Sequence, residues 1–270
     1  MKISVVIPSY NRYEVLKRAL ASVYAQTHTP FEVIVIDDGS TDSTSKIQED
    51  FPDVKYFYKD NGGVSSARNF GVKCSSFEWV AFLDSDDEWD ENKLKEQVAF
   101  HEENSDVLMS YTAEKWIRDA VEVKIPKKFR KYGGDIFEKC LSHCIIAPSA
   151  TLIHKDLLTA VGDFDEELEV CEDYDLWLRV SRKHRIGLIY KPLITKYGGA
   201  KDQLSAKYWG MDRFRVVALE KLLLNDGVKR DLILNELLKK YRLLLKGAVK
   251  HDRTLEIESY LKKIETYENL

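Results

Sequence analysis

The chain opens with alternating runs of strand-like and helix-like hydrophobic pattern. Continuous apolar, β-branched runs are typical of strands buried on both faces, and apolar positions three and four apart are typical of amphipathic helices. Strands are predicted at residues 2–8, 31–38, 54–59, 78–84 and 106–113. Helices are predicted between them at residues 12–26, 40–51 (with Ser40 or Thr41 as N-cap), 62–74 and 91–104. This order predicts an α/β fold with a mostly parallel sheet flanked by helices.

The pattern is less regular after residue 113. We expect a short strand at 121–125, a helix at 135–144, a strand at 150–155 leading into a helix, a helix beginning near Glu172, and one or two strands within 185–197. From about residue 206 the pattern is helical to the end. We therefore divide the chain into a domain at 1–205, with halves at about 1–112 and 113–205, and a helical C-terminal extension at 206–270.

The C-terminal extension carries apolar stripes and many lysines. One stripe consists of Leu234, Leu237, Leu238, Tyr241 and Leu245. Such a stripe predicts packing between helices or a homodimer interface. A peripheral contact with anionic lipid at the inner face of a membrane is the alternative.

Composition excludes several classes of protein. The 270 residues carry a net charge of −4, which indicates no general attraction to nucleic acid. No apolar run approaches the ~20 residues of a membrane span, and the N-terminus lacks the pattern of a secretory signal. Four cysteines are too few for a disulfide scaffold. Cys140 and Cys144 have helical spacing but no further zinc ligands at a matching distance. We expect reduced thiols in a cytoplasmic protein.

Polar side chains follow each of the first four predicted strands. The strand ends read Pro8-Ser9-Tyr10-Asn11, Asp37-Asp38-Gly39-Ser40, Asp60-Asn61-Gly62-Gly63 and Asp84-Ser85-Asp86-Asp87. Ligands of open α/β sheets bind at the carboxyl ends of the strands. Four such ends in succession therefore predict a binding site along one edge of the sheet.

The acids after the fourth strand have two interpretations. Two carboxylates about 4 Å apart repel by about 4 kcal/mol at an effective dielectric near 20. They either begin the next helix or hold a divalent cation, because Mg²⁺ and Mn²⁺ prefer oxygen ligands. We assign Glu88 to a helix start, where the macrodipole favours acids, and leave Asp87 open. Turn chemistry could explain Gly39, Ser40 and Thr41, whereas we leave Asp37 open and favour a nucleotide contact for Asp38.

Five segments together resemble the family 2 glycosyltransferases of the GT-A fold. They are SVVIPSYNR, EVIVIDDGSTD, NGGVSSARN, FLDSDD and CEDYDLWLR, in the family's order within residues 1–185. The resemblance implies an inverting, metal-dependent transfer of a sugar from a nucleotide diphosphate, such as a UDP-sugar, to a hydroxyl. The acceptor would be a carbohydrate or a lipid-linked molecule in cell-surface glycan or polysaccharide biosynthesis.

The resemblance also implies roles for individual residues. The nucleotide-binding residues would be Pro8, Ser9, Tyr10, Asp38, Asn61, Gly63, Arg68, Asp84 and Ser85. Asp84 and Asp86 would bind Mn²⁺ or Mg²⁺ together with the donor's phosphates. Asp173 would be the catalytic base, with Glu172 second and Asp175 third in rank. A positioned carboxylate can serve as the base in such a reaction.

One part of the family pattern is missing from the chain. Many GT-A enzymes take a further metal ligand, often histidine, from a loop that here corresponds to residues 196–205. That loop has no histidine, so Asp202 or water would substitute. His154 lies elsewhere and is interpreted as structural. A non-catalytic nucleotide-sugar-binding module and a sugar nucleotidyltransferase are the alternatives, although PSYNRYE lacks the glycine-rich phosphate loop expected of the latter.

Overall fold

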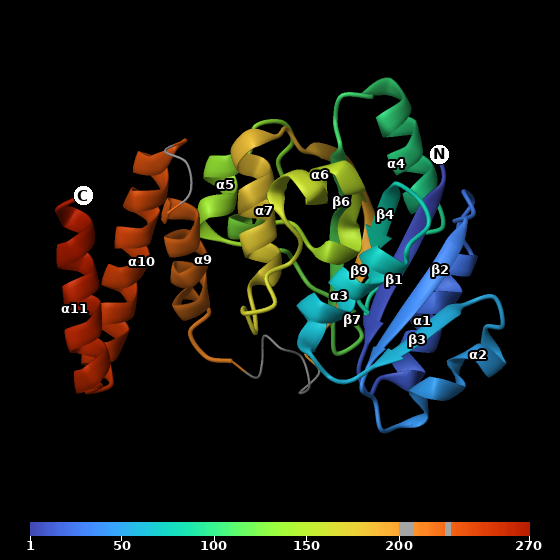
Figure 1. Ribbon diagram of the computed structural model, residues 1–270, viewed down its shortest axis with the longest axis horizontal. Helices are drawn as coiled ribbons and strands as arrows, with labels where there is room; N and C mark the ends of the chain where they lie inside the picture. The colour runs from blue at the N-terminus through green and yellow to red at the C-terminus, as the bar shows by residue number, and fades with distance from the viewer. Residues whose placement is uncertain (200–207, 225–227) are drawn as a thin grey trace.

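A nine-stranded sheet organises the part of the chain that the computed structural model describes, residues 1–199, 208–224 and 228–270 (Figure 1). The strands run in the order β3-β2-β1-β4-β8-β6-β9-β5, with β7 paired to β6. Their bounds are β1 Ile3–Ser9, β2 Glu32–Asp38, β3 Lys55–Lys59, β4 Trp79–Phe82, β5 Glu88–Trp89, β6 Met109–Arg118, β7 Val121–Glu122, β8 Thr151–His154 and β9 Gly187–Gly198.

Helices cover the sheet and extend beyond it. The α-helices are α1 Tyr13–Tyr24, α2 Ile47–Asp50, α3 Gly63–Cys74, α4 Lys93–Glu103, α5 Phe137–Ser142, α6 Lys155–Val161, α7 Glu172–Lys183, α9 Asp212–Leu224, α10 Arg230–Lys250 and α11 Thr254–Glu268. Short 3₁₀ turns are η1 Ser43–Lys46, η2 Lys127–Phe129 and η3 Pro148–Ala150.

The first four strands form the predicted parallel arrangement. β1 pairs in parallel with β2 and β4, and β2 pairs in parallel with β3. Every residue of β1 and β2 is buried, which explains why both segments lack hydrophobic alternation. The carboxyl ends of all four strands consequently meet at one edge of the sheet, as the predicted α/β fold requires.

The second half of the chain makes the sheet mixed. β8 is antiparallel to both β4 and β6, and β9 is parallel to β6. Two reversals restore the original direction, so β6 and β9 end at the same edge as β1 to β4. β6 continues five residues past its predicted end at 113. The binding edge therefore also receives side chains from β6 and β9, which the strand-end pattern did not include.

Three local predictions are wrong in their details. The segment 40–51 forms η1 and α2 instead of one helix, and its cap is Asp42, whose carboxylate accepts the Thr44 N–H. Ser40 instead accepts the Asn11 N–H, which ties β1 to β2. The strand expected at 121–125 is only the two-residue β7, a hairpin partner of β6. The helix α5 ends at Ser142, so Cys144 lies outside it.

The interpretation of Glu88 as a helix-start acid is also wrong. Glu88 lies in β5, where it pairs with Thr195 of β9, and α4 begins only at Lys93. The Tyr197 hydroxyl donates to the Glu88 carboxylate at 2.7 Å. The reason is tertiary, because the two-residue strand β5 exists only through its pairing with β9.

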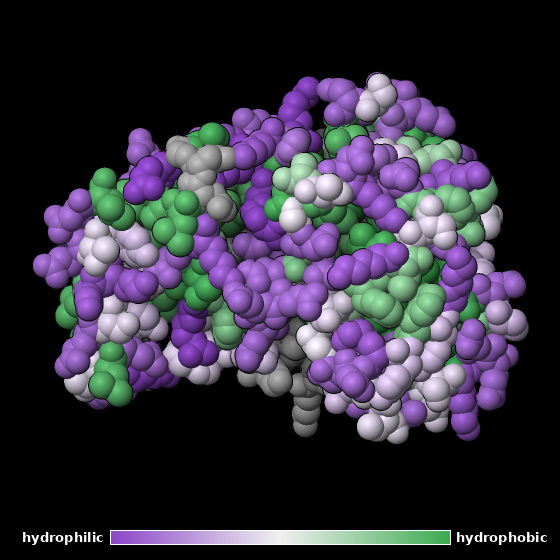
Figure 2. Space-filling view, in the orientation of Figure 1, coloured by the Kyte–Doolittle hydropathy of each residue, from purple (hydrophilic) through white to green (hydrophobic). Residues whose placement is uncertain are grey.

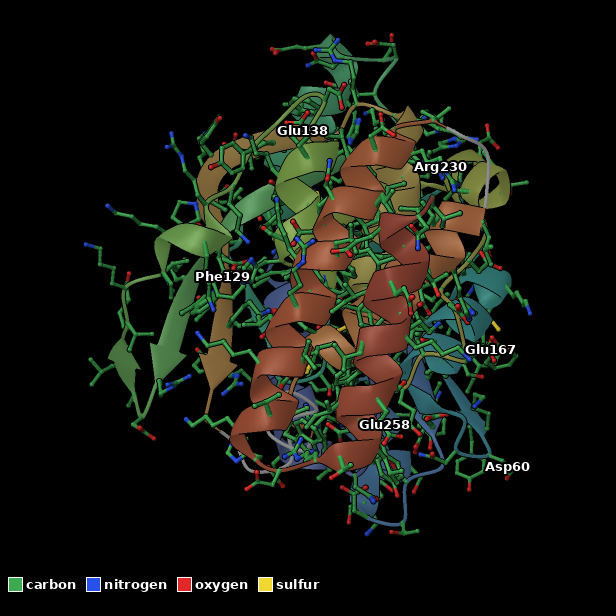
Figure 3. All side chains as sticks on the ribbon, turned by 90° about the vertical axis from the view of Figure 1, so that its left-hand side faces the viewer. Asp60, Phe129, Glu138, Glu167, Arg230 and Glu258 are labelled. Carbon is green, nitrogen blue, oxygen red and sulfur yellow. The ribbon has the colours of Figure 1, made fainter. Side chains whose placement is uncertain are left out.

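The C-terminal helices pack on one another and on the second half of the fold. α9 contacts α7, α10 contacts α5 and α9, and α11 contacts α10. In Figure 3 the pair α10–α11 faces the viewer, with Arg230 and Glu258 labelled. Leu237 and Tyr241 of the predicted stripe are buried in the same apolar cluster as the sheet. This stripe serves packing within the chain.

The outer surface of these helices is mixed in character. On the face drawn in Figure 2, apolar residues over α10 and α11 are interrupted by hydrophilic ones. Within the described residues, none of the helices combines the length and the apolar character that a membrane crossing demands.

Candidate functional site

Arg68 joins two segments of the predicted site that lie far apart in the sequence. Its Nη1 donates to Glu172 Oε1 and its Nη2 to Asp84 Oδ1, both at 2.7 Å, and its side chain is only 4% exposed. Arg68 reaches this position because α3 packs closely on the sheet. A Cβ added at Gly71 would lie 2.3 Å from a Val6 methyl, so only glycine allows this approach. The helix thus sets the guanidinium between β4 and α7.

The two carboxylates that share Arg68 differ in their electrostatics. Burial opposes ionisation of Asp84, but the charge and hydrogen bond of Arg68 outweigh it and lower the pKa of that carboxyl. For Glu172, burial and the neighbouring Asp173 charge raise the pKa to about 7, despite the opposing effect of Arg68. Asp84 is therefore the permanent anion of this pair, and Glu172 titrates near neutrality.

The acids that follow β4 separate into two groups. Asp86 pairs with the Arg12 guanidinium at 2.9 Å, at the edge of the sheet beside Asp84. Asp87 is buried and accepts the Ser149 hydroxyl at 2.6 Å, while Ser149 Oγ accepts the Asp84 N–H. Burial, together with the Asp84 and Asp86 charges, raises the pKa of Asp87 to about 8. Asp87, which the sequence left undecided, is thus an internal residue that supports the Asp84 loop.

Lys196 of β9 is a basic residue of the site that the sequence reading missed. Burial opposes its charge, but the carboxylates of Asp87, Glu114, Asp84 and Asp173 outweigh burial and raise its pKa. Its amine therefore stays charged among four acids from three segments, the loop after β4, β6 and α7. A lysine near the end of an expected strand carries no sequence signal for this role, because only the pairing of β6 with β9 brings these acids together.

Asp38 anchors the start of α3. Its Oδ1 accepts the Lys59 amine at 2.6 Å and the Gly62 N–H at 3.0 Å, and its Oδ2 accepts the Gly63 N–H at 2.8 Å. The Asn61 amide donates to the Asp38 carbonyl at 2.8 Å. Three of the predicted nucleotide-binding residues, Asp38, Asn61 and Gly63, are thus joined directly. The nucleotide contact of Asp38 stays a prediction.

The end of β1 offers one exposed aromatic ring. Pro8 and Ser9 are buried within the strand, and Tyr10 is 49% exposed. Ser85, after β4, is also buried. The Ser9 hydroxyl is buried without a hydrogen-bond partner among the described residues. Of this group, Tyr10 is therefore the side chain that presents a surface to a ligand.

The first turn of α7 carries the three candidate bases in different environments. Asp175 is buried and accepts both Nε and Nη2 of Arg179, at 2.9 and 2.7 Å. Glu172 is buried against Arg68. Asp173 is half-buried, with the Tyr174 N–H on its Oδ1 at 2.7 Å and the Cys144 thiol on its Oδ2 at 3.2 Å. Asp173 is the most accessible of the three carboxylates, which suits the role predicted for it.

The described residues offer an incomplete set of metal ligands at this edge. Asp84 and Asp86 supply carboxylate oxygens, and Asp202, the suggested third ligand, lies outside the described residues. Mg²⁺ and Mn²⁺ sites often use one or two carboxylates completed by substrate phosphates and water. The residues therefore fit a cation that binds together with a phosphorylated substrate.

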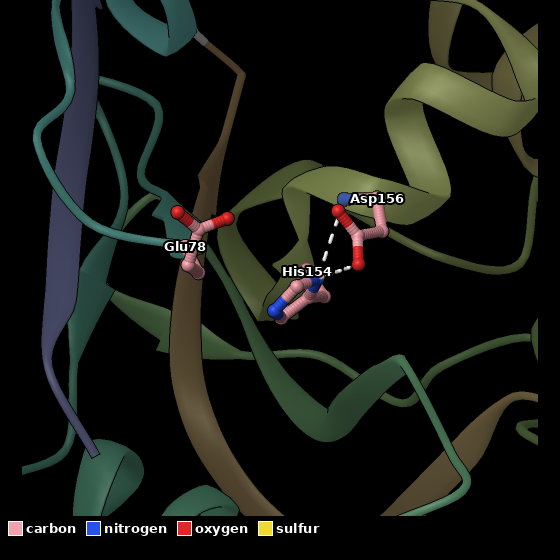
Figure 4. Close-up of side chains that lie close together, drawn as sticks. All are labelled: Glu78, His154 and Asp156. Atoms are coloured by element: carbon pink, nitrogen blue, oxygen red, sulfur yellow. Dashed lines mark hydrogen bonds and ion pairs between the residues drawn. The ribbon is translucent and has the colours of Figure 1, made fainter.

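A second acidic cluster lies at the opposite end of β4 (Figure 4). Glu78, His154 and Asp156 come close together there, immediately before β4 and after β8. His154 Nδ1 accepts the Asp156 N–H and caps α6, and its ring packs against Trp79 at 5.1 Å. The four residues of β4, roughly 13 Å of strand, separate this cluster from Asp84. His154 accordingly caps a helix, in line with the structural role predicted for it, and lies at the opposite end of β4 from the candidate site.

Comparison with known proteins agrees with this geometry. The model of the family described as Glycosyl transferase family 2 matches residues 4–162. The chain belongs to this family. An uncharacterized glycosyltransferase of Rickettsia bellii is 38% identical over 195 residues, which cover 71% of this chain and 28% of that protein. The chain thus spans about a third or less of the length of the first three curated relatives it matches.

Other glycosyltransferases match over more of their length. The UDP-Glc:alpha-D-GlcNAc-diphosphoundecaprenol beta-1,3-glucosyltransferase WfgD of Escherichia coli is 28% identical over 235 residues, 85% of this chain and 88% of that protein. The structure of S. aureus TarS 1–349 with UDP-GlcNAc has a TM-score of 0.71 at 24% identity and covers 89% of this chain and 71% of that chain. The mannosyltransferase PcManGT of Pyrobaculum calidifontis, with GDP-Man and Mn²⁺, has a TM-score of 0.62 at 17% identity, covering 99% and 82%. These likenesses show the GT-A fold.

Proposed function

We propose that this glycosyltransferase is an inverting enzyme that moves a sugar from a UDP-sugar to a hydroxyl of a carbohydrate or lipid-linked acceptor in cell-surface glycan assembly. The observation that carries the proposal is the Arg68 bridge. Arg68 ties Asp84, on the donor side, to Glu172, beside the candidate base Asp173. Arg68 would thereby keep the carboxylate that faces the donor close to the helix that carries the proposed base, so that both could flank the reacting carbon.

The donor would bind along the ends of β1, β2, β3 and β4. Tyr10 would contact the nucleoside, and the N-terminus of α3, which Asp38 anchors, would lie beside it. Asp84 and Asp86 would hold Mn²⁺ or Mg²⁺. Such an ion would supply Lewis-acid stabilisation of the departing diphosphate. Arg12, Arg68 and Lys196 add fixed positive charge around these carboxylates.

Asp173 would accept the proton of the acceptor hydroxyl. The hydroxyl oxygen forms a bond to the anomeric carbon while the bond from that carbon to the diphosphate oxygen breaks, and the proton passes to Asp173. One displacement inverts the anomeric configuration and needs a single base and no protein nucleophile. Asp173 is suited to this by its exposure, since Glu172 and Asp175 are both buried in ion pairs with arginine.

The acceptor and the surroundings of the enzyme are part of the proposal. The Escherichia coli relative is named for a lipid-diphosphate acceptor, and its similarity extends over 85% of this chain. We therefore place the enzyme in the cytoplasm, at the surface of a membrane that holds a similar acceptor. The lysine-rich C-terminal extension, residues 206–270, would supply that peripheral contact or a homodimer interface beside the catalytic domain at 1–205.

Transfer assays with a matched pair of variants test the proposal. UDP-glucose, UDP-N-acetylglucosamine, UDP-galactose and GDP-mannose would be offered with a lipid-linked GlcNAc diphosphate, with and without MnCl₂, while nucleotide release is measured. Asp173→Asn should lose at least about 100-fold in turnover, in line with removal of a general base. The donor should still raise the melting temperature of this variant as it does for the wild type. Glu169→Gln, which changes an exposed acid four residues earlier, should match the wild type.

The other outcomes separate the alternatives. Undiminished turnover by Asp173→Asn would overturn the base assignment, and a product with retained anomeric configuration by NMR would overturn the inverting mechanism. Stabilisation by a nucleotide-sugar without any turnover would favour a non-catalytic binding module. Pyrophosphate release from a nucleoside triphosphate and a sugar phosphate would favour a nucleotidyltransferase.

A further inference from the structure

The chain from the last turn of α5 to η3 is held by side chains from other parts of the fold. Four backbone carbonyls, two at the end of α5 and two in the loop that follows it, each accept a hydrogen bond from a different side chain. The pairs are Tyr174 hydroxyl to Leu141, Lys240 amine to Ser142, Lys131 amine to Ile145 and Trp177 indole to Ile146. These donors come from α7, α10 and the chain before α5. The backbone on both sides of Cys144 is therefore fixed relative to α7.

This anchoring directs the Cys144 thiol at the candidate base. Cys144 Sγ lies 3.2 Å from Asp173 Oδ2 and 3.2 Å from the Ile146 carbonyl oxygen. An ionised carboxylate and a carbonyl oxygen can only accept, so these contacts require a protonated thiol, whose single S–H is shared between the two oxygens. Desolvation and the adjacent Asp173 charge raise the pKa of Cys144 well above its usual value. The thiol is thus a neutral donor and is unsuited to act as a nucleophile.

We propose that Cys144 is a positioning residue, whose S–H donates to Asp173 and holds that carboxylate in the orientation that receives the acceptor's proton. The inference rests on the proposed function, in which Asp173 is the base. Asp173 is then held at both oxygens, by the Tyr174 N–H on Oδ1 and by Cys144 on Oδ2. Each carboxylate oxygen keeps a second lone pair with which it can receive the hydroxyl proton.

Rescue by a hydroxyl group is the readout that separates positioning from packing. Among the described residues, the ionisable groups that face Asp173 are Glu172 and Cys171 at the start of α7, Cys144 from its anchored segment and Lys196 from β9. A serine hydroxyl in place of the thiol should retain the hydrogen bond, whereas an alanine methyl group removes it.

The experiment compares Cys144→Ala and Cys144→Ser with the wild type. UDP release from UDP-glucose and from UDP-N-acetylglucosamine would be measured from pH 5 to 9 with the lipid-linked GlcNAc diphosphate as acceptor. Cys144→Ala should lower kcat by about threefold to tenfold, as loss of one hydrogen bond of ordinary strength from a weak thiol donor suggests, with the donor KM within about twofold. Cys144→Ser should recover most of kcat.

Two further thiols of the chain supply matched controls. Cys140→Ala removes a buried thiol four residues earlier, and Cys74→Ala removes one at the end of α3. Both should behave as the wild type in kcat and pH profile. An infrared difference spectrum between wild type and Cys144→Ala isolates the Cys144 S–H stretch without any turnover. That band should lie at lower frequency in the wild type than in Asp173→Ala, where the carboxylate acceptor is absent.

Each contrary result has a distinct meaning. Wild-type kcat and pH profile in Cys144→Ala, alongside an inactive Asp173→Asn, would overturn the role of the thiol and leave the base assignment standing. Equal impairment of Cys144→Ser and Cys144→Ala would show a packing effect and also overturn it. An S–H band unmoved by Asp173→Ala would exclude the contact itself. Full activity of Asp173→Asn would overturn the proposed function and this inference together.

Discussion

The two ends of β4 both carry acidic side chains, but their surroundings differ. At the carboxyl end, Asp84 and Asp86 form ion pairs with Arg68 and Arg12, which come from other elements. At the amino end, Glu78 and Asp156 are exposed and lie beside His154. The amino-end group has closer metal-like spacing, yet it sits far from every other predicted site residue. Ion pairing with arginines from distant elements thus distinguishes the carboxyl-end acids, which we propose as the site, from the amino-end group.

Among substitutions at the two ends of β4, removal of Arg68 should cause the largest loss of stability and turnover. Arg68→Met leaves Glu172 buried without its partner and Asp84 without its main counter-charge. Breaking a buried ion pair in this way costs about 3–5 kcal/mol. Urea unfolding should show a loss of this order, and turnover should fall as well.

Glu172→Gln tests whether the loss in Arg68→Met comes from an unpaired buried charge. Combined with Arg68→Met, it removes one of the stranded charges and should recover part of the lost stability. An Arg68→Met protein that unfolds at the same urea concentration as the wild type would contradict the bridging role.

The next effect concerns the carboxyl-end acids themselves. Asp86→Asn should reduce transfer by about 100-fold, equivalent to about 2.7 kcal/mol in the barrier, because a cation held with the donor's phosphates would lose a charged ligand. The Mn²⁺ concentration that gives half-maximal nucleotide release should also rise. Turnover and Mn²⁺ dependence equal to wild type would exclude Asp86 as a ligand.

A smaller effect is expected from His101, which packs against Trp79 near the amino end of β4. Burial lowers its pKa from 6.5 to about 4, assisted by His154 and opposed by the Val107 carbonyl. The unfolded chain binds a proton on this imidazole more readily than the folded protein does. The contribution of neutral His101 to the free energy of unfolding is therefore complete above pH 6.5 and is lost as the pH falls toward 4. The loss from His101 between pH 7 and pH 5 should be about 2 kcal/mol.

Urea unfolding of wild type and His101→Gln at both pH values measures this contribution. The variant cannot take up the proton, so its stability should fall less over the same interval. Equal pH dependence in the two proteins would assign the acid sensitivity to other groups.

The smallest effect is expected from the amino-end acids. Asp156→Asn and Glu78→Gln alter exposed side chains away from the site, so turnover should stay within about twofold and stability within about 0.5 kcal/mol. They are the matched partners of Asp86→Asn. A loss of turnover comparable to that of Asp86→Asn would mean that the functional metal site lies at the other end of the strand.

The sequence predicted the scaffold of the site more fully than its contacts. Patterns within a few residues predict that β2 ends at Asp38 and that α7 begins at Glu172, and the structure has both there, while β4 ends at Phe82, two residues before its predicted end at Asp84. Glu88 was misassigned because β5 exists only by pairing with β9. Asp87 could not be assigned because its partner Ser149 lies 62 residues away.

The amino-acid sequence alone determined most of the strands and helices, and that polar groups follow each of the first four strands. Those properties depend on hydrophobic periodicity and turn chemistry between near neighbours in the chain. Only the tertiary structure decided which charges meet. Arg68 pairs with Glu172, which is 104 residues away in the sequence. Lys196 lies among the acids because β9 pairs with β6. Cys144 contacts Asp173 because four side chains anchor the backbone around it. Such contacts depend on how packed elements are arranged in space, and no local pattern encodes that arrangement.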